Sequence, residues 1–292
     1  MYDKLLKSNA VLGKSKSTFN NYIRQIAKIS LHYGIVAHKL TADQVQDYLF
    51  LLKSQSNSAS ESTFKHTIYG LRFMLKLYDL PYAHLKLPQL KREKSLPVVL
   101  SKQEMFALLK HAALLKHKIL IGLLYGCGLR CFEVRNIRLR DIDIDRQQLH
   151  ITQGKGKKAR YVPLSTHLIR GLKAYISAEK PKDWLFNGQP IERAGGDFDS
   201  RYSQRGVQWA INQAVKRAGI KKHVTTHTLR HTYATHLLED GLDIMSIKEL
   251  MGHARIETTL VYLHVAQLDP KRRFSPLDTL FEVCKPHIKS SR

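Results

Sequence analysis

The first 90 residues carry apolar side chains every three to four positions, which is the spacing of helices that bury one face. Residues 17–33, 41–54 and 62–80 show this pattern. The apolar positions of the first of these segments are Phe19, Ile23, Ile26 and Leu31. The second segment opens with a Thr-x-x-Gln sequence, the spacing of a helix capping box. No strand alternation competes with these patterns, so we expect an all-α domain of about four helices over residues 1–86.

Residues 87–99 break the helical pattern. Two prolines flank a short basic run there, formed by Lys91, Arg92 and Lys94. Such a composition favours an extended linker between domains. Its positive charge would allow it to lie along DNA, so these three residues are predicted to bind DNA.

Residues 100–292 mix two kinds of pattern. Residues 147–165 predict a β-hairpin, since β-branched side chains flank a glycine-containing turn. Helical spacing returns in four later segments, residues 206–218, 228–240, 243–251 and 257–264. The chain is therefore expected to be mainly α-helical with a small antiparallel β-sheet: an N-terminal helical domain and a C-terminal mixed α/β domain.

Charge indicates the partner. Lysine and arginine number 48 against 24 aspartate and glutamate, a net charge of +24. The excess is +7 over residues 1–90 and +17 over the rest, so both parts are basic. A surface this basic repels itself, and solubility is better served by acidic residues, which favours a nucleic-acid partner. The three cysteines form no C-x-x-C pair, which fits a reducing cytoplasm. The longest apolar stretch, residues 119–129, is too short to span a membrane.

The segment HTLRHTYATH, residues 227–236, concentrates three histidines and an arginine on one predicted helix. His227 and His231 have the spacing of a zinc-binding helix, but the position of the zincin glutamate is occupied by Thr228. Arg230 between the histidines disfavours a dication. A permanent cation beside a group that titrates near neutrality suits a phosphodiester instead. On this interpretation His231 is a supporting neighbour, and His236 lies on the packed or solvent side.

Other segments offer further parts of a phosphodiester site. Arg130 follows a glycine-rich turn, and Glu133 one turn later is placed to fix its guanidinium. The hairpin turn gathers four cations that could grip phosphate, one of which could also donate a proton to a leaving oxygen. These are Lys155, Lys157, Lys158 and Arg160. Tyr262 taken alone is as consistent with a core residue as with a reactive one.

Taken in order, these motifs resemble the tyrosine recombinases of the phage integrase and Xer type. Arg130 stands in G-L-R-x-x-E, Lys155 in G-K-G-x-K-x-R, His227 and Arg230 in H-x-L-R-H, His253 in L-x-G-H and Tyr262 in T-T-x-x-Y. Each motif alone is weak, but the ordered set is specific, and the resemblance covers the whole chain. It implies a core-binding domain over residues 1–86 and a catalytic domain over residues 100–292, with a tail from about residue 265.

The resemblance also implies a mechanism. Tyr262 would form a 3′-phosphotyrosine, and Arg130 and Arg230 would clamp the phosphate. Lys155 would protonate the leaving 5′-oxygen, His227 would act as base or proton shuttle, and His253 would hydrogen-bond the phosphate.

No metal or cofactor is expected, since arginines supply the positive charge and the covalent bond stores the phosphodiester energy. The expected partners are a double-stranded DNA recombination site and further copies of the chain, in a tetramer formed on DNA through the C-terminal tail. A type IB topoisomerase-like enzyme and a DNA-binding regulator with an inactive catalytic domain remain alternatives.

Overall fold

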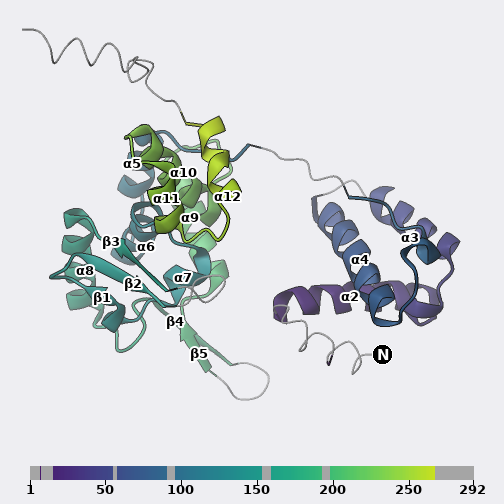
Figure 1. Ribbon diagram of the computed structural model, residues 1–292. Helices are drawn as coiled ribbons and strands as arrows, with labels where there is room; N and C mark the ends of the chain where they lie inside the picture. Colours follow the sequence, from purple (N-terminus) through teal and green to yellow (C-terminus); the bar gives the residue numbers. More distant parts are fainter. Residues whose placement is uncertain are drawn as a thin grey trace, which may run out of the picture. The chain divides into compact units, whose positions relative to one another are not determined.

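The computed structural model describes Lys7 and residues 16–54, 58–90, 96–152, 159–192 and 198–266 (Figure 1). The chain divides into two compact units, Met1–Lys94 and Ser95–Arg292. The boundary falls within the predicted linker, whose Lys91, Arg92 and Lys94 lie outside the described residues. No helix in the described part of the chain is long and apolar enough to cross a membrane.

The N-terminal unit is helical where it is described. Its elements are α2 (Lys16–Tyr33), η1 (Ala37–Lys39), α3 (Ala42–Ser54), α4 (Ser58–Leu77) and η2 (Tyr82–Leu85). Their apolar faces form one core that includes Ile29, Leu71 and Met74. Gly70 lets α4 approach α2 closely, since a Cβ there would lie 3.1 Å from the carbonyl oxygen of Tyr22. The predicted stripe of the first helix is wrong at one position, because Leu31 is 81% exposed.

The C-terminal unit begins with helices that enclose a second core. These are α5 (Lys102–Lys110), α6 (Leu115–Gly126) and α7 (Cys131–Arg135), followed by η3 (Leu139–Asp141). α6 is apolar on nearly every side and packs against α8 (Thr166–Glu179). Gly122 and Gly126 make this approach possible, because a Cβ at either would meet the Leu168 side chain at about 3 Å.

Two antiparallel sheets flank these helices. The first has the strand order β1 (Ile142–Asp143), β2 (Gln148–Ile151) and β3 (Arg160–Pro163). β2 and β3 are the two strands of the predicted hairpin, and their buried side chains Leu149 and Val162 are direct partners. The second sheet pairs β4 (Asn187–Glu192) with β5 (Phe198–Arg201). The expectation of a mainly helical protein with a small antiparallel sheet is confirmed.

The last helices carry most of the residues selected from the sequence. They are α9 (Gln204–Arg217), α10 (Thr226–Glu239), α11 (Ile244–Met251) and α12 (Glu257–Leu260), followed by η4 (Val261–His264). α10 contacts α6, α9, α11 and η4. The expected helix over residues 257–264 is instead a short α-helix that tightens into a 3-10 turn at the position of Tyr262.

Candidate active site

α10 is the central helix of the site and begins at a capping box. The Thr225 hydroxyl accepts from the backbone N–H of Thr228, and the Thr228 hydroxyl accepts from the backbone N–H of Thr225. This start places His227 in the first turn and Arg230 in the next. Ten of the fourteen residues of α10 are buried, so the helix packs on most of its surface. His236 is buried too, within hydrogen-bonding distance of the Tyr125 hydroxyl and the Leu100 carbonyl oxygen.

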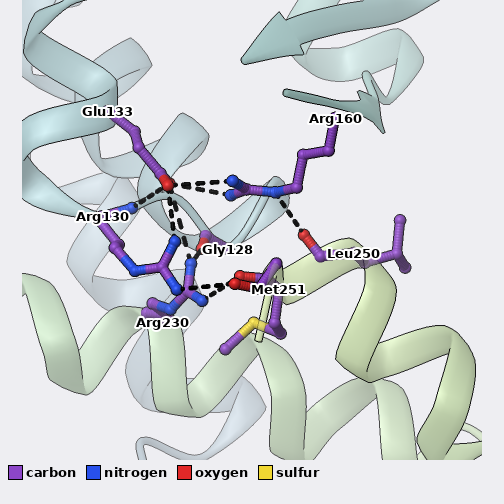
Figure 2. A network of polar contacts seen from close by, with 8 residues as sticks. Gly128, Arg130, Glu133, Arg160, Arg230, Leu250 and Met251 are labelled. Atoms are coloured by element: carbon purple, nitrogen blue, oxygen red, sulfur yellow. Dashed lines mark hydrogen bonds and ion pairs between the residues drawn. The ribbon is translucent and has the colours of Figure 1, made fainter. Parts of the chain in front are cut away.

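Three guanidiniums converge on the C-terminal end of α11. The last carbonyls of a helix lack partners within it. Here three successive carbonyls are satisfied by arginines from three other elements (Figure 2). Arg160 Nε donates to the Leu250 carbonyl at 2.8 Å, Arg230 donates to that of Met251, and Arg130 Nη2 donates to that of Gly252 at 3.2 Å. The turn that leads into His253 is therefore held by the arginines of the site.

The Glu133 carboxylate is the counter-charge of this cluster (Figure 2). Its oxygens accept from the backbone N–H of Arg130 at 2.9 Å and from the Arg130 guanidinium at 2.7 Å. Arg160 adds two hydrogen bonds, at 3.0 and 2.9 Å, and Arg230 lies 3.9 Å away. Burial alone would raise the pKa of this carboxyl, but the hydrogen bonds and charges of Arg160 and Arg130 outweigh it and lower the pKa from 4.5 to about 2.

The side chain of Arg160 points into the protein, whereas the sequence had predicted that it faces solvent in the hairpin turn. We expected it among the cations of the hairpin turn that face DNA. Instead its side chain is 10% exposed, and it turns inward onto Glu133 and the end of α11. The physical reason is the carboxylate, which is 99% buried and is matched by a fork of two parallel N–H donors. The other three cations of the turn, Lys155, Lys157 and Lys158, lie outside the described residues.

The cluster holds more positive than negative charge. Three guanidiniums face one carboxylate, which leaves an excess of two charges among the described residues of the cluster. Burial, then the neighbouring Arg130, lowers the pKa of Arg230 to about 9, which still leaves it protonated at neutral pH. An anion would relieve this unbalanced charge.

The hydroxyl of Tyr262 lies beside this cluster. Tyr262 is 1% exposed, and burial raises its pKa, while the charges of Arg230 and Arg130 lower it. His231 Nδ1 lies 3.1 Å from the hydroxyl oxygen. The ring of His253 stacks on the tyrosine ring, with centroids 6.4 Å apart, and its Nδ1 lies 2.9 Å from the Thr259 hydroxyl.

Arg130, Glu133, Arg230, His253 and Tyr262 come together, although they span more than 130 residues of sequence. His227 has an exposed side chain, and its ring lies 6.5 Å from that of His231. Partial desolvation, then the charges of Arg230 and Arg130, lowers the pKa of His227. His231 is the residue that sequence reasoning undervalued. Its H-x-x-x-H spacing was visible, but its contact with Tyr262 spans 31 residues of sequence.

No group of three or more histidine, cysteine or acidic side chains within the described ranges is arranged to hold a metal ion. The arrangement that is present offers fixed guanidinium donors, neutral imidazoles and a buried phenol. Such groups can bind a phosphodiester and transfer it to a hydroxyl nucleophile.

Comparison with known proteins identifies the class. Residues 98–268, more than half of the chain, match the model of the phage integrase family. A tyrosine recombinase of Thermosipho africanus is 34% identical over 266 residues, which cover 86% of this chain and 90% of that protein. Tyrosine recombinase XerC of Bacillus subtilis is 30% identical over 277 residues and 87% of each chain. The chain belongs to the phage integrase family of tyrosine recombinases, which are DNA strand transferases.

A solved structure supports the fold. The Tn1549 transposon integrase, determined in complex with a circular intermediate DNA, superposes with a TM-score of 0.70 over 89% of this chain and 93% of that one, at 16% sequence identity. The two alternatives left open by the sequence, a topoisomerase-like enzyme and an inactive regulator, are not favoured by these relatives.

Proposed function

We propose that this recombinase cuts and rejoins DNA at a specific site by attack of Tyr262 on a phosphodiester. The observation that carries the proposal is the under-neutralised arginine cluster beside the buried phenol. One phosphodiester has a single negative charge, which would offset part of the excess. Arg130 and Arg230 are the phosphate clamp, and both are already positioned by backbone carbonyls and Glu133, so little reorganisation accompanies binding.

The bonding changes balance without a metal or cofactor. The Tyr262 oxygen forms a bond to phosphorus, and the bond to the 5′-oxygen breaks. The phenol proton leaves for a protein base, and the 5′-oxygen takes a proton from Lys155, the general acid. His253 and His227 complete the site as phosphate ligand and proton shuttle. A 5′-hydroxyl from a partner strand then attacks the phosphotyrosine, which restores both the phosphodiester and the phenol.

The rest of the chain supplies DNA contacts. We assign residues 1–86 to a core-binding domain, residues 87–99 to a basic linker and residues 100–292 to the catalytic domain. Lys91, Arg92, Lys94, Lys157 and Lys158 are the DNA-binding residues of this proposal. Arg160 leaves that group, because its guanidinium is engaged within the site. A net charge of +24 supports an extensive phosphate interface.

Assembly and location are parts of the same proposal. Strand exchange between two duplexes uses four active subunits, so we propose a tetramer on DNA in which the tail from about residue 265 docks on a neighbouring copy. We also propose a cytoplasmic location, because the three cysteines form no C-x-x-C pair, which fits a reducing compartment.

Two assays test this proposal: strand exchange between two DNA duplexes, and relaxation of a supercoiled plasmid. The full chain is used to select duplexes from a random pool, and two selected duplexes with different labels are then incubated with it. Exchange of flanks between the duplexes is expected with the wild-type chain and with Tyr161→Phe, a matched change at a tyrosine that is 60% exposed. Tyr262→Phe is expected to bind the duplexes without exchange. Relaxation of a supercoiled plasmid that carries the site, without any exchange, would support a topoisomerase instead.

A further inference from the structure

His231 is the polar partner of the reactive hydroxyl. It lies on α10, one residue after Arg230, and its Nδ1 is 3.1 Å from the Tyr262 hydroxyl oxygen. The two ring centroids are 5.7 Å apart. We propose that His231 is a catalytic residue that accepts the proton of Tyr262 as the phenol attacks phosphorus. The proposal rests on the proposed function of Tyr262 and replaces His227 as the direct base.

The burial of the phenol makes a protein base necessary. With 1% of its surface exposed, Tyr262 cannot release its proton to bulk water. Burial also raises its pKa, so spontaneous ionisation is rarer than for a free tyrosine. A group already in hydrogen-bonding contact is the natural acceptor, because proton transfer needs a heavy-atom distance of about 2.6–3.2 Å.

The neighbours of Tyr262 are less suited to this step. The ring of His253 lies nearly parallel to the tyrosine ring, at 17°, and its Nδ1 is engaged with Thr259. The ring of His227 lies beside that of His231, so His227 is farther from the Tyr262 hydroxyl than His231 is. The arginines of the cluster are donors without acceptor capacity. Within the described residues, the group in hydrogen-bonding contact with the Tyr262 hydroxyl oxygen is therefore Nδ1 of His231.

The charges around His231 keep it ready to accept a proton. His227 and Arg230 face it from its own helix, while Tyr262, His253, Arg130 and Arg160 face the site from other elements. Burial, then the charges of His227 and Arg230, lowers the His231 pKa to about 4, so the imidazole is neutral at pH 7. A bound phosphodiester adds negative charge, which stabilises an imidazolium. Proton transfer to His231 is therefore easier when DNA occupies the site than when the site is empty.

The step conserves protons and bonds. The Tyr262 oxygen bonds to phosphorus as its proton moves to His231 Nδ1, and the departing 5′-oxygen takes a proton from Lys155. His227, with its ring 6.5 Å from that of His231, can pass the proton outward. In the religation step the 5′-hydroxyl attacks the phosphotyrosine and returns its proton to Lys155, while the leaving phenolate regains its proton from His231.

The test variant is His231→Asn, used in the full chain. The asparagine side chain can place an oxygen near the position of Nδ1, so it keeps an acceptor for the phenol but cannot take the proton. The readout is the single-turnover rate of covalent adduct formation on a nicked duplex selected by binding to the wild-type chain. We expect a loss of about 10²–10⁴-fold at pH 7 with unchanged DNA affinity. The deficit should shrink as the pH rises, because the phenol then ionises without a base.

His264→Asn is the matched control, since its exposed side chain lies on the same 3-10 turn as Tyr262. It should react at the wild-type rate. A His231→Asn chain that reacts as fast as wild type, or faster, would overturn the proposal, as would a deficit that is independent of pH. If the wild-type chain forms no adduct on any selected duplex, the proposed function itself fails.

A second measurement requires no variant. In ¹⁵N-histidine spectra of the wild-type chain, Nδ1 of His231 should be unprotonated and should accept from the phenol. A protonated Nδ1 that donates to Tyr262 would overturn the role as base.

Discussion

Replacing Glu133 with glutamine removes the charge that holds three arginines together. The carboxylate is 99% buried and contacts Arg130 and Arg160 directly, with Arg230 3.9 Å away. A glutamine has nearly the same volume, so the substitution leaves packing intact. It replaces one acceptor oxygen by an NH₂ group that points at guanidinium donors. The arginines then lack a counter-charge inside the protein.

The pKa of Glu133 sets the size of the effect. Its fall from 4.5 to about 2 on folding corresponds to about 3 kcal/mol of stabilisation at pH 7. Removing one partner of a buried pair costs a similar amount, about 3–5 kcal/mol. Since the folded pKa is the lower one, this stabilisation is complete above pH 4.5 and is lost as the pH falls through about 2. At pH 3.5 the difference between wild type and Glu133→Gln should be smaller by about 1.4 kcal/mol.

Tryptophan fluorescence during urea unfolding measures the free energy of unfolding of the C-terminal unit. The two tryptophans, Trp184 and Trp209, both belong to the C-terminal unit. Glu179→Gln is the matched control, because Glu179 is exposed at the end of α8 and should change the free energy of unfolding by less than about 0.5 kcal/mol. A loss below about 1 kcal/mol for Glu133→Gln at pH 7, or the same loss at pH 3.5, would show that the Glu133 charge does not stabilise the C-terminal unit.

Three further changes test other parts of the site. Gly128→Ala should destabilise the C-terminal unit by at least about 2 kcal/mol, because Gly128 has φ +59° and a Cβ would lie 2.3 Å from the ring of Tyr233; a wild-type unfolding midpoint would contradict this. Arg160→Lys keeps the charge but loses the fork to Glu133, so the same assay should show a loss of about 1–3 kcal/mol, with Lys173→Arg on α8 as the exposed control. DNA affinity should fall at least about tenfold between about 50 and 200 mM salt, and a salt-independent Kd from filter binding would argue against a phosphate-dominated interface.

The sequence predicts those features of the fold that depend on local interactions. Helical spacing located α9, α10 and α11 to within about two residues, because each has an apolar face and a polar cap close in sequence. The hairpin of β2 and β3 was predicted from its glycine-containing turn and from the β-branched side chains of its strands. The contact between Arg130 and Glu133 was predictable for the same reason, because the two residues are only three positions apart, at the start of α7.

Long-range contacts to backbone atoms account for what could not be predicted. The carbonyls of Leu250, Met251 and Gly252 accept from arginines between 21 and 122 residues away, and a carbonyl leaves no signature in the sequence. The inward turn of Arg160 depends on the same contacts. The burial of most of α10 could not be predicted either, because several of its ten buried residues are polar. Several of these polar groups are buried and hydrogen-bonded: the Thr232 hydroxyl donates to the Thr228 carbonyl and accepts from the backbone N–H of Leu100.

The position of the covalent bond identifies the nucleophile. The wild-type chain is incubated with a nicked selected duplex in the presence of EDTA, the adduct is digested with nuclease and protease, and the modified peptide is sequenced by mass spectrometry. We expect a nucleotide remnant joined through a 3′-phosphate to Tyr262, and no adduct with Tyr262→Phe. A remnant on another residue, or an adduct that persists in Tyr262→Phe, would contradict the assignment of Tyr262 as the nucleophile.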